Sequence, residues 1–127
     1  MKILIIDDDV SAATTLKALL MSQDGYEIDI TYDGRKGLDM MITNPGYDLL
    51  ILDVMMPDFS GMDVCKAMAK DDKLKNIPVL LASALPIASR ELAELLDEFK
   101  NLNVKGALEK PFVMDDLLAT IKKISKV

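Results

Sequence analysis

Three short runs of continuous apolar residues constrain the fold of this chain more than any other feature of its sequence. The runs cover residues 3–6, 49–52 and 79–82. Strands without a polar face are typical of the middle of a parallel sheet, where helices cover both faces. The runs therefore predict three central strands of such a sheet.

Segments with apolar residues at helical spacing lie between and after these runs. The first carries Leu16, Leu19 and Leu20, the second Leu38, Met41 and Ile42, and a third near Gly61 carries Val64, Ala67 and Met68. The pattern then predicts strands over residues 27–31 and 104–108 and helices over 88–100 and 113–126, with Ser11 as cap of the first helix. Repeated strand–helix units favour right-handed crossovers and a three-layer α/β fold with helices on both faces.

Length, charge and missing residue types narrow the function classes. A chain of 127 residues can bury one ordinary core, so we predict a single domain over residues 1–127. Its net charge of -6 disfavours direct binding to nucleic acid or anionic membranes. Cys65 is the only cysteine and histidine is absent, which excludes an internal disulfide, a zinc cluster, a Ser-His-Asp triad and a phosphohistidine on this chain. Without a signal peptide or a membrane-length apolar run, we expect a cytoplasmic protein.

Unusual polar residues follow the predicted strands. Three aspartates, Asp7, Asp8 and Asp9, come after the first strand and Asp53 after the third, while Ser83 follows the fourth and Lys110 the fifth. The carboxyl ends of parallel strands form one edge of a sheet, and ligands bind in the crevice there. Residues from both ends of the chain should therefore meet at one site.

The chemistry of that site follows from its charges. Clustered carboxylates repel one another and either share a proton or bind a cation, and Mg²⁺ prefers oxygen ligands of this kind. Lys110 and the hydroxyl of Ser83 could balance the charge of a phosphoryl group in transit. An aspartate can then act as the nucleophile. Asp9 is interpreted as a first-turn residue of the following helix rather than as a ligand.

In this order, the motifs resemble the receiver domains of two-component response regulators over nearly the whole chain. The matching stretches are ILIIDDD (3–9), LILDVMMPDFSG (50–61), VLLASA (79–84) and EKPF (109–112). The resemblance implies a flavodoxin-like, doubly wound (βα)5 fold with strand order 2-1-3-4-5. It also implies that Asp53 accepts the phosphoryl group and that Ser83 and Lys110 contact the phosphoryl oxygens. The same resemblance implies that Asp8, Asp53 and the carbonyl of Met55 ligate Mg²⁺ or Mn²⁺, and that Asp7 acts on the cation mainly through bound water.

The same resemblance implies partners and activity. The donor would be a phosphohistidine on a histidine kinase or a histidine phosphotransfer domain, and the signal would pass to a downstream protein or output domain. The domain would catalyse its own phosphorylation and dephosphorylation rather than turn over a separate substrate. No output domain is expected within these residues, and the Lys110-Pro111 peptide bond is predicted to be cis.

Three features depart from the family pattern. Ala107 stands where the family usually has an aromatic switch residue, so the route of the signal out of the domain is open. The fourth helix is predicted to be extended, around residues 91–101. Met55 and Leu85 are apolar at positions that tune phosphoryl lifetime, and we hypothesise slow self-hydrolysis, since neither can orient a water.

Three other functions remain alternatives at this point. Asp7 could be the nucleophile of a haloacid dehalogenase-like phosphatase, which would leave the Asp53 loop unexplained. A flavin-binding electron carrier shares the architecture, but acidic residues stand where its phosphate loop should be. A receiver-like module that binds partners without phosphorylation is favoured by Ala107 and disfavoured by the intact acidic residues, Ser83 and Lys110.

Overall fold

The computed structural model describes residues 1–23, 25–44, 46–56, 58–84, 90–99, 102–110 and 114–125. These residues form a sheet of five parallel strands in the order β2-β1-β3-β4-β5, which confirms the predicted class and strand order. The strands are β1 (Lys2–Ile6), β2 (Glu27–Thr31), β3 (Leu49–Asp53), β4 (Val79–Ser83) and β5 (Val104–Glu109). The helices between and after them are α1 (Val10–Met21), α2 (Gly34–Thr43), α3 (Gly61–Ala69), α4 (Arg90–Glu98) and α5 (Met114–Ser125).

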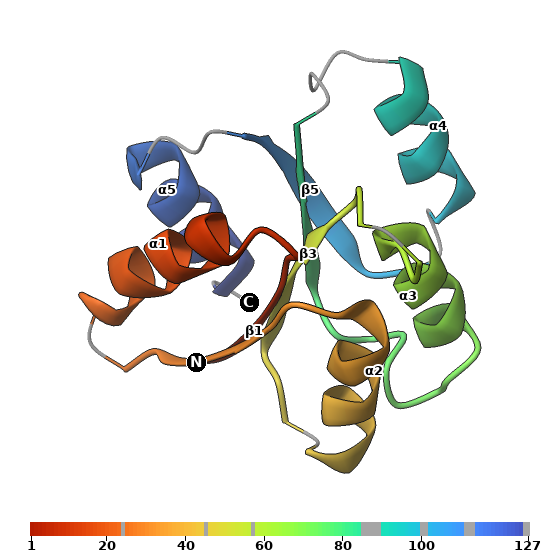
Figure 1. Cartoon of the computed structure of the whole chain (residues 1–127), viewed down its shortest axis with the longest axis horizontal. Coiled ribbons are helices and arrows are strands. Elements are labelled where there is room, and N and C mark those ends of the chain that lie inside the picture. The colour runs from red at the N-terminus through yellow and green to blue at the C-terminus, as the bar shows by residue number, and fades with distance from the viewer. Residues whose placement is uncertain are drawn as a thin grey trace.

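The helices cover both faces of the sheet (Figure 1), with α1 and α5 on one side and α2, α3 and α4 on the other. Alternate residues of β1 serve the two sides: Ile3 and Ile5 belong to the apolar cluster with α1 and α5, and Leu4 and Ile6 belong to the cluster with α2 and α3. Each of these four side chains is fully buried. This arrangement explains the absence of a polar face in the apolar run of the sequence.

The first helix, α1, is capped by a different residue from the one predicted. Asp9, and not Ser11, caps α1, and its carboxylate accepts a hydrogen bond from the backbone N–H of Ala12 at 3.1 Å. Either residue type can cap a helix, and the aspartate takes the position because α1 begins at Val10, two residues earlier than a helix capped by Ser11 would begin. The assignment of Ser11 as the cap and of Asp9 as a first-turn residue was therefore wrong.

The fourth helix also ends earlier than predicted. It ends at Glu98, and the next residue, Phe99, lies in a turn. The carbonyl of Phe99 accepts a hydrogen bond from the N–H of Leu102. Phe99 and Leu102 are both buried in the cluster with α2 and α3, so these two apolar residues pack on the core after the helix has ended.

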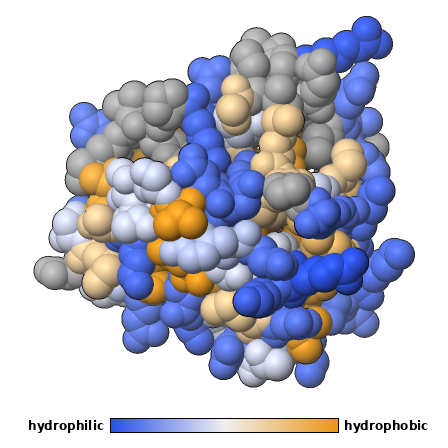
Figure 2. All heavy atoms as spheres, viewed as in Figure 1, coloured by the Kyte–Doolittle hydropathy of each residue, from blue (hydrophilic) through white to orange (hydrophobic). Residues whose placement is uncertain are grey.

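Hydrophilic residues dominate the face of the molecule seen in Figure 2, and apolar residues appear there in small patches. The large apolar side chains that are most exposed are Val10, Met21, Tyr32, Ile42 and Met55. Among the described residues, every helix is too short or too polar to cross a membrane.

Candidate functional site

The predicted site residues lie at the carboxyl ends of four neighbouring strands. Asp7 directly follows β1, and Lys110 directly follows β5. Asp53 and Ser83 are the last residues of β3 and β4 rather than the residues after them, since their backbones still pair with Ala82 and Glu109. The spatial order β1-β3-β4-β5 brings these four ends together at one edge of the sheet.

Three carboxylates gather at this edge. Asp7, Asp8 and Asp53 each offer one oxygen, and the three oxygens lie within 4.8 Å of one another. Asp7 and Asp53 are only 3% and 5% exposed, whereas Asp8 is exposed. The predicted cluster is therefore present. The next residue, Asp9, lies outside this cluster, because the Asp9 side chain caps α1.

Lys110 joins this acidic cluster to the end of β4. Its Nζ lies 2.6 Å from Oδ2 of Asp7 and 3.4 Å from Oδ2 of Asp53, and its side chain is 17% exposed. Its backbone N–H donates to the carbonyl of Ser83 at 2.8 Å. The buried Ser83 is thus fixed next to the lysine by the sheet itself.

The environment changes the acidity of two of these groups. Burial, together with the neighbouring charge of Asp7, raises the pKa of Asp53 from 3.8 to about 7, against the opposing effects of Lys110 and the Met55 N–H. Burial alone would lower the pKa of Lys110, but its interactions with Asp7 and Asp53 outweigh burial and leave that pKa raised. The lysine therefore stays charged, while the acidic cluster holds more negative charge than one lysine balances. Oxygen ligands with excess negative charge fit a hard divalent cation.

The loop after β3 places a further predicted residue beside the cluster. The N–H of Met55 donates to Oδ1 of Asp53 at 3.1 Å, and the Met55 side chain is 59% exposed. Gly61 closes the loop at its far end, where a Cβ would lie 2.3 Å from the carbonyl oxygen of Asp53. This contact was not predicted from the sequence, although the glycine directly before a helical apolar pattern was a usable signal for it.

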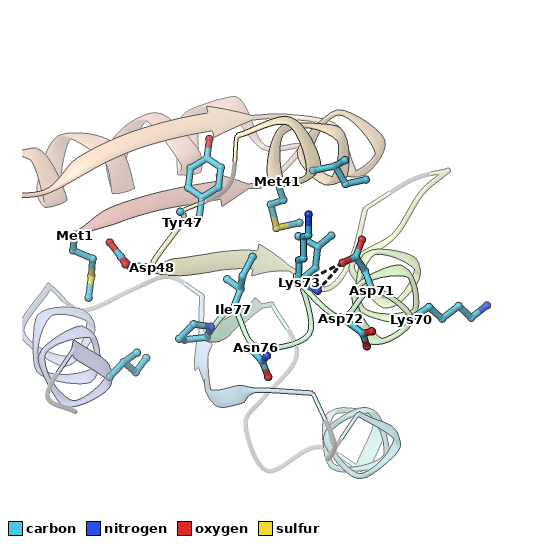
Figure 3. Close-up of a pocket in the computed structure, with 15 residues that line it drawn as sticks. Met1, Met41, Tyr47, Asp48, Lys70, Asp71, Asp72, Lys73, Asn76 and Ile77 are labelled. Atoms are coloured by element: carbon cyan, nitrogen blue, oxygen red, sulfur yellow. Dashed lines mark hydrogen bonds between the residues drawn. The ribbon is translucent and has the colours of Figure 1, made fainter.

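A broad pocket lies at the opposite edge of the sheet (Figure 3). Met1, Tyr47, Asp48 and Ile77 line it, and they lie at or before the amino ends of β1, β3 and β4. This pocket is therefore separated by the length of the strands from the acidic cluster and takes no part in the site.

The geometry above coincides with sequence and structural similarity to known proteins. Residues 3–122 match the family model described as "Response regulator receiver domain". This chain belongs to the response regulator receiver family. Response regulator MprA of Mycobacterium avium is 33% identical over 124 residues, which are 98% of this chain and 50% of that protein. Response regulator ArlR of Staphylococcus saprophyticus is 30% identical over 95% of this chain and 50% of that protein.

Solved receiver structures agree with this assignment. Chemotaxis protein CheY4 of Vibrio cholerae matches with a TM-score of 0.83 and 29% identity over 97% of both chains. The receiver domain of the Francisella response regulator 1452 matches with a TM-score of 0.78 and 29% identity, over 97% of this chain and 94% of that one.

Membership of the receiver family sets the general function. The chain is a receiver domain of a two-component response regulator, a family that works by phosphorylation of an aspartate, generally binds Mg²⁺ at an acidic pocket, and interacts with histidine kinases and downstream output domains. The family match favours this function over a phosphatase with Asp7 as nucleophile and over a flavin carrier. The chain spans about half the length of the MprA and ArlR relatives.

Two predictions concern residues that the structure does not describe. The cis peptide bond before Pro111 and the side chain of Leu85 both lie outside the described residues.

Proposed function

We propose that Asp53 of this receiver domain accepts a phosphoryl group from a phosphohistidine donor in a reaction that requires Mg²⁺, or Mn²⁺ in its place. The observation that carries the proposal is the position of the Asp53 carboxylate. It is buried at the end of β3, it lies 3.4 Å from the Nζ of Lys110, and it shares a 4.8 Å cluster with Asp7 and Asp8.

The residues would divide the work as follows. A carboxylate oxygen of Asp53 attacks phosphorus, and the bond between phosphorus and the donor nitrogen breaks. Lys110 and the hydroxyl of Ser83 stabilise the charge on the transferred oxygens. Asp8, Asp53 and the carbonyl of Met55 would hold the cation directly, and Asp7 would hold it mainly through water. When bound, Mg²⁺ supplies the positive charge that lets a phosphoryl dianion approach three carboxylates.

The partners follow from the same chemistry. Because the chain has no histidine, the phosphohistidine must come from a separate kinase or phosphotransfer domain. We treat residues 1–127 as a single domain that passes the signal to a downstream protein or output domain, without direct contact to nucleic acid or membrane. We place it in the cytoplasm, since its one cysteine can form no internal disulfide.

The test is the intact mass of the protein after treatment with acetyl phosphate, with and without Mg²⁺. We expect the wild type to gain one phosphoryl group only when Mg²⁺ is present, and Asp53→Asn to gain none. Asp58→Asn is the matched control, because Asp58 is an exposed acid of the same loop. A wild type that gains no mass with Mg²⁺ would overturn the proposal and favour a module that binds partners without phosphorylation.

A further inference from the structure

The loop between β3 and α3 is held against the first turn of α2. A Cβ at Gly34 would lie 2.5 Å from the carbonyl oxygen of Phe59, so the two backbones pack directly against each other. The guanidinium of Arg35 lies over the Phe59 ring, 4.6 Å from its centroid. We call these three residues, Gly34, Arg35 and Phe59, the loop clamp.

The start of α2 gives the loop clamp a fixed base. Asp33 caps this helix, and its carboxylate accepts hydrogen bonds from the N–H groups of Arg35 at 2.7 Å and Lys36 at 3.2 Å. The backbone of Arg35 is therefore held in place, so only the side chain loses conformational freedom when the guanidinium stacks on the ring of Phe59.

The loop that the clamp holds requires support from its neighbours. Asp58 has a φ of 64°, in the left-handed region that residues other than glycine adopt at a free-energy cost. At the end of the loop, Ser60 and Asp63 form a capping box at the start of α3. The loop is thus anchored at Asp53 and at Ser60, and the loop clamp supplies the contact between these anchors.

The loop clamp also adjoins the acidic cluster. Arg35 and Phe59 line a cleft together with Asp8 and Asp58. In the described residues Arg35 forms no ion pair, although carboxylates line the same cleft. Its stack on Phe59 is therefore the contact that defines the position of the guanidinium.

We propose that Arg35 and Phe59 are positioning residues for the divalent cation. They keep the β3–α3 loop in the one conformation in which the carbonyl of Met55 can serve as a ligand. The inference rests on the proposed function, in which Met55 is a ligand. If the loop were released, only a fraction of the molecules would be competent to bind, and the apparent affinity would fall by that fraction.

Electrostatics makes the opposite prediction, which allows a sharp test. Removal of a positive charge near three carboxylates should leave Mg²⁺ binding unchanged or strengthen it. Lys36 is the matched control, because it is the exposed neighbour of Arg35 and takes no part in the stack on Phe59. A loss of affinity on Arg35→Ala but not on Lys36→Ala can therefore come only from the loop.

The experiment is a titration with Mg²⁺ alone, followed by NMR through the backbone amides of Asp8 and Met55. We expect Arg35→Ala and Phe59→Leu to weaken Mg²⁺ binding by about two- to fivefold, the range of an exposed cation–π contact. Phe59→Tyr keeps an aromatic face for Arg35 and should therefore bind Mg²⁺ as tightly as wild type does. Urea unfolding of each variant gives its stability, so that affinity and stability are compared separately.

The outcomes separate this inference from the proposed function. If wild type does not bind Mg²⁺ at Asp8 and Met55, the proposed function fails. If wild type binds Mg²⁺ and Arg35→Ala binds it as tightly as Lys36→Ala does, the positioning role is overturned. It is also overturned if Arg35→Ala lowers the stability of the protein and leaves its affinity for Mg²⁺ unchanged. Weakened binding in Arg35→Ala and Phe59→Leu, with Phe59→Tyr and Lys36→Ala unchanged, supports it.

Discussion

The Nζ of Lys110 donates a hydrogen bond of 2.6 Å to Oδ2 of Asp7, a residue 103 positions earlier in the chain, and lies farther, at 3.4 Å, from Asp53. The lysine is thus bound more closely to a neighbouring acid than to the proposed phosphoacceptor. A cation bound by the acids would release the lysine toward the phosphoryl oxygens. Lys110 therefore has one task in holding the acidic side chains together and another in the proposed reaction.

Replacement of Lys110 should separate these two tasks. Lys110→Met leaves three carboxylates without their balancing charge, and we expect a loss of about 1 to 3 kcal/mol in the free energy of unfolding at neutral pH without Mg²⁺. Mg²⁺ should bind more tightly, while phosphorylation from acetyl phosphate should become slower. Urea unfolding, Mg²⁺ titration and intact mass measure the three effects. Lys105→Met, at an exposed position of β5, should change none of them.

The pH dependence of stability should reveal the burial of Asp53. Its pKa is raised from 3.8 to about 7, so between these pH values the native state binds a proton that the unfolded chain has released. The stabilisation that this proton brings is complete below pH 4 and is lost as the pH rises through 7. Without Mg²⁺, wild type should therefore lose about 1 to 3 kcal/mol more than Asp53→Asn between pH 5 and pH 8.

Urea unfolding in EDTA at the two pH values measures this difference. Addition of Mg²⁺ at pH 8 should restore stability to wild type and have less effect on Asp53→Asn, because the cation takes over the role of the proton. Equal pH dependence in the two proteins would show that Asp53 is an ordinary carboxylate.

How much of this site the sequence could predict depends on the range of the interactions. The meeting of Asp7, Asp53 and Lys110 was predictable, because parallel strands place their carboxyl ends on one edge and each residue follows or ends an apolar run. The ends of β3 and β4 were placed one residue too early, since backbone pairing continues through Asp53 and Ser83 after the apolar pattern stops.

The contacts that hold the site in shape were not predictable in this way. Arg35 stacks on Phe59 only because the start of α2 packs against the β3–α3 loop, and neither residue belongs to a periodic pattern. The same holds away from the site, where the hydroxyl of Tyr47 donates to Asp29 at 2.6 Å across 18 positions of the chain. Such pairs depend on side-chain directions that are settled only when the elements pack.

Two glycines offer a matched test of packing around the phosphoacceptor. A Cβ at Gly61 would lie 2.3 Å from the carbonyl oxygen of Asp53, whereas a Cβ at Gly106 would have no neighbour closer than Leu80 at 3.8 Å. Alanine is otherwise the better residue in a helix, yet we expect Gly61→Ala to destabilise the protein by about 1 to 3 kcal/mol. Gly106→Ala should be neutral or slightly stabilising. Urea unfolding measures both, and equal effects would contradict the close contact.

The lifetime of the phosphorylated protein tests the role of Met55. Its backbone N–H donates to Asp53, and its exposed side chain has no group that can orient an attacking water, so we expect slow hydrolysis of the aspartyl phosphate. Met55→Asn should shorten the half-life by about threefold to tenfold, measured by intact mass after removal of the donor. Met21→Asn is the control, because Met21 is equally exposed, at 60% against 59%, and is the last residue of α1, far from the strand ends that hold the site. A half-life that Met55→Asn leaves unchanged would mean that the rate of hydrolysis is set elsewhere, by access of water to the phosphoryl group rather than by a side chain that orients it.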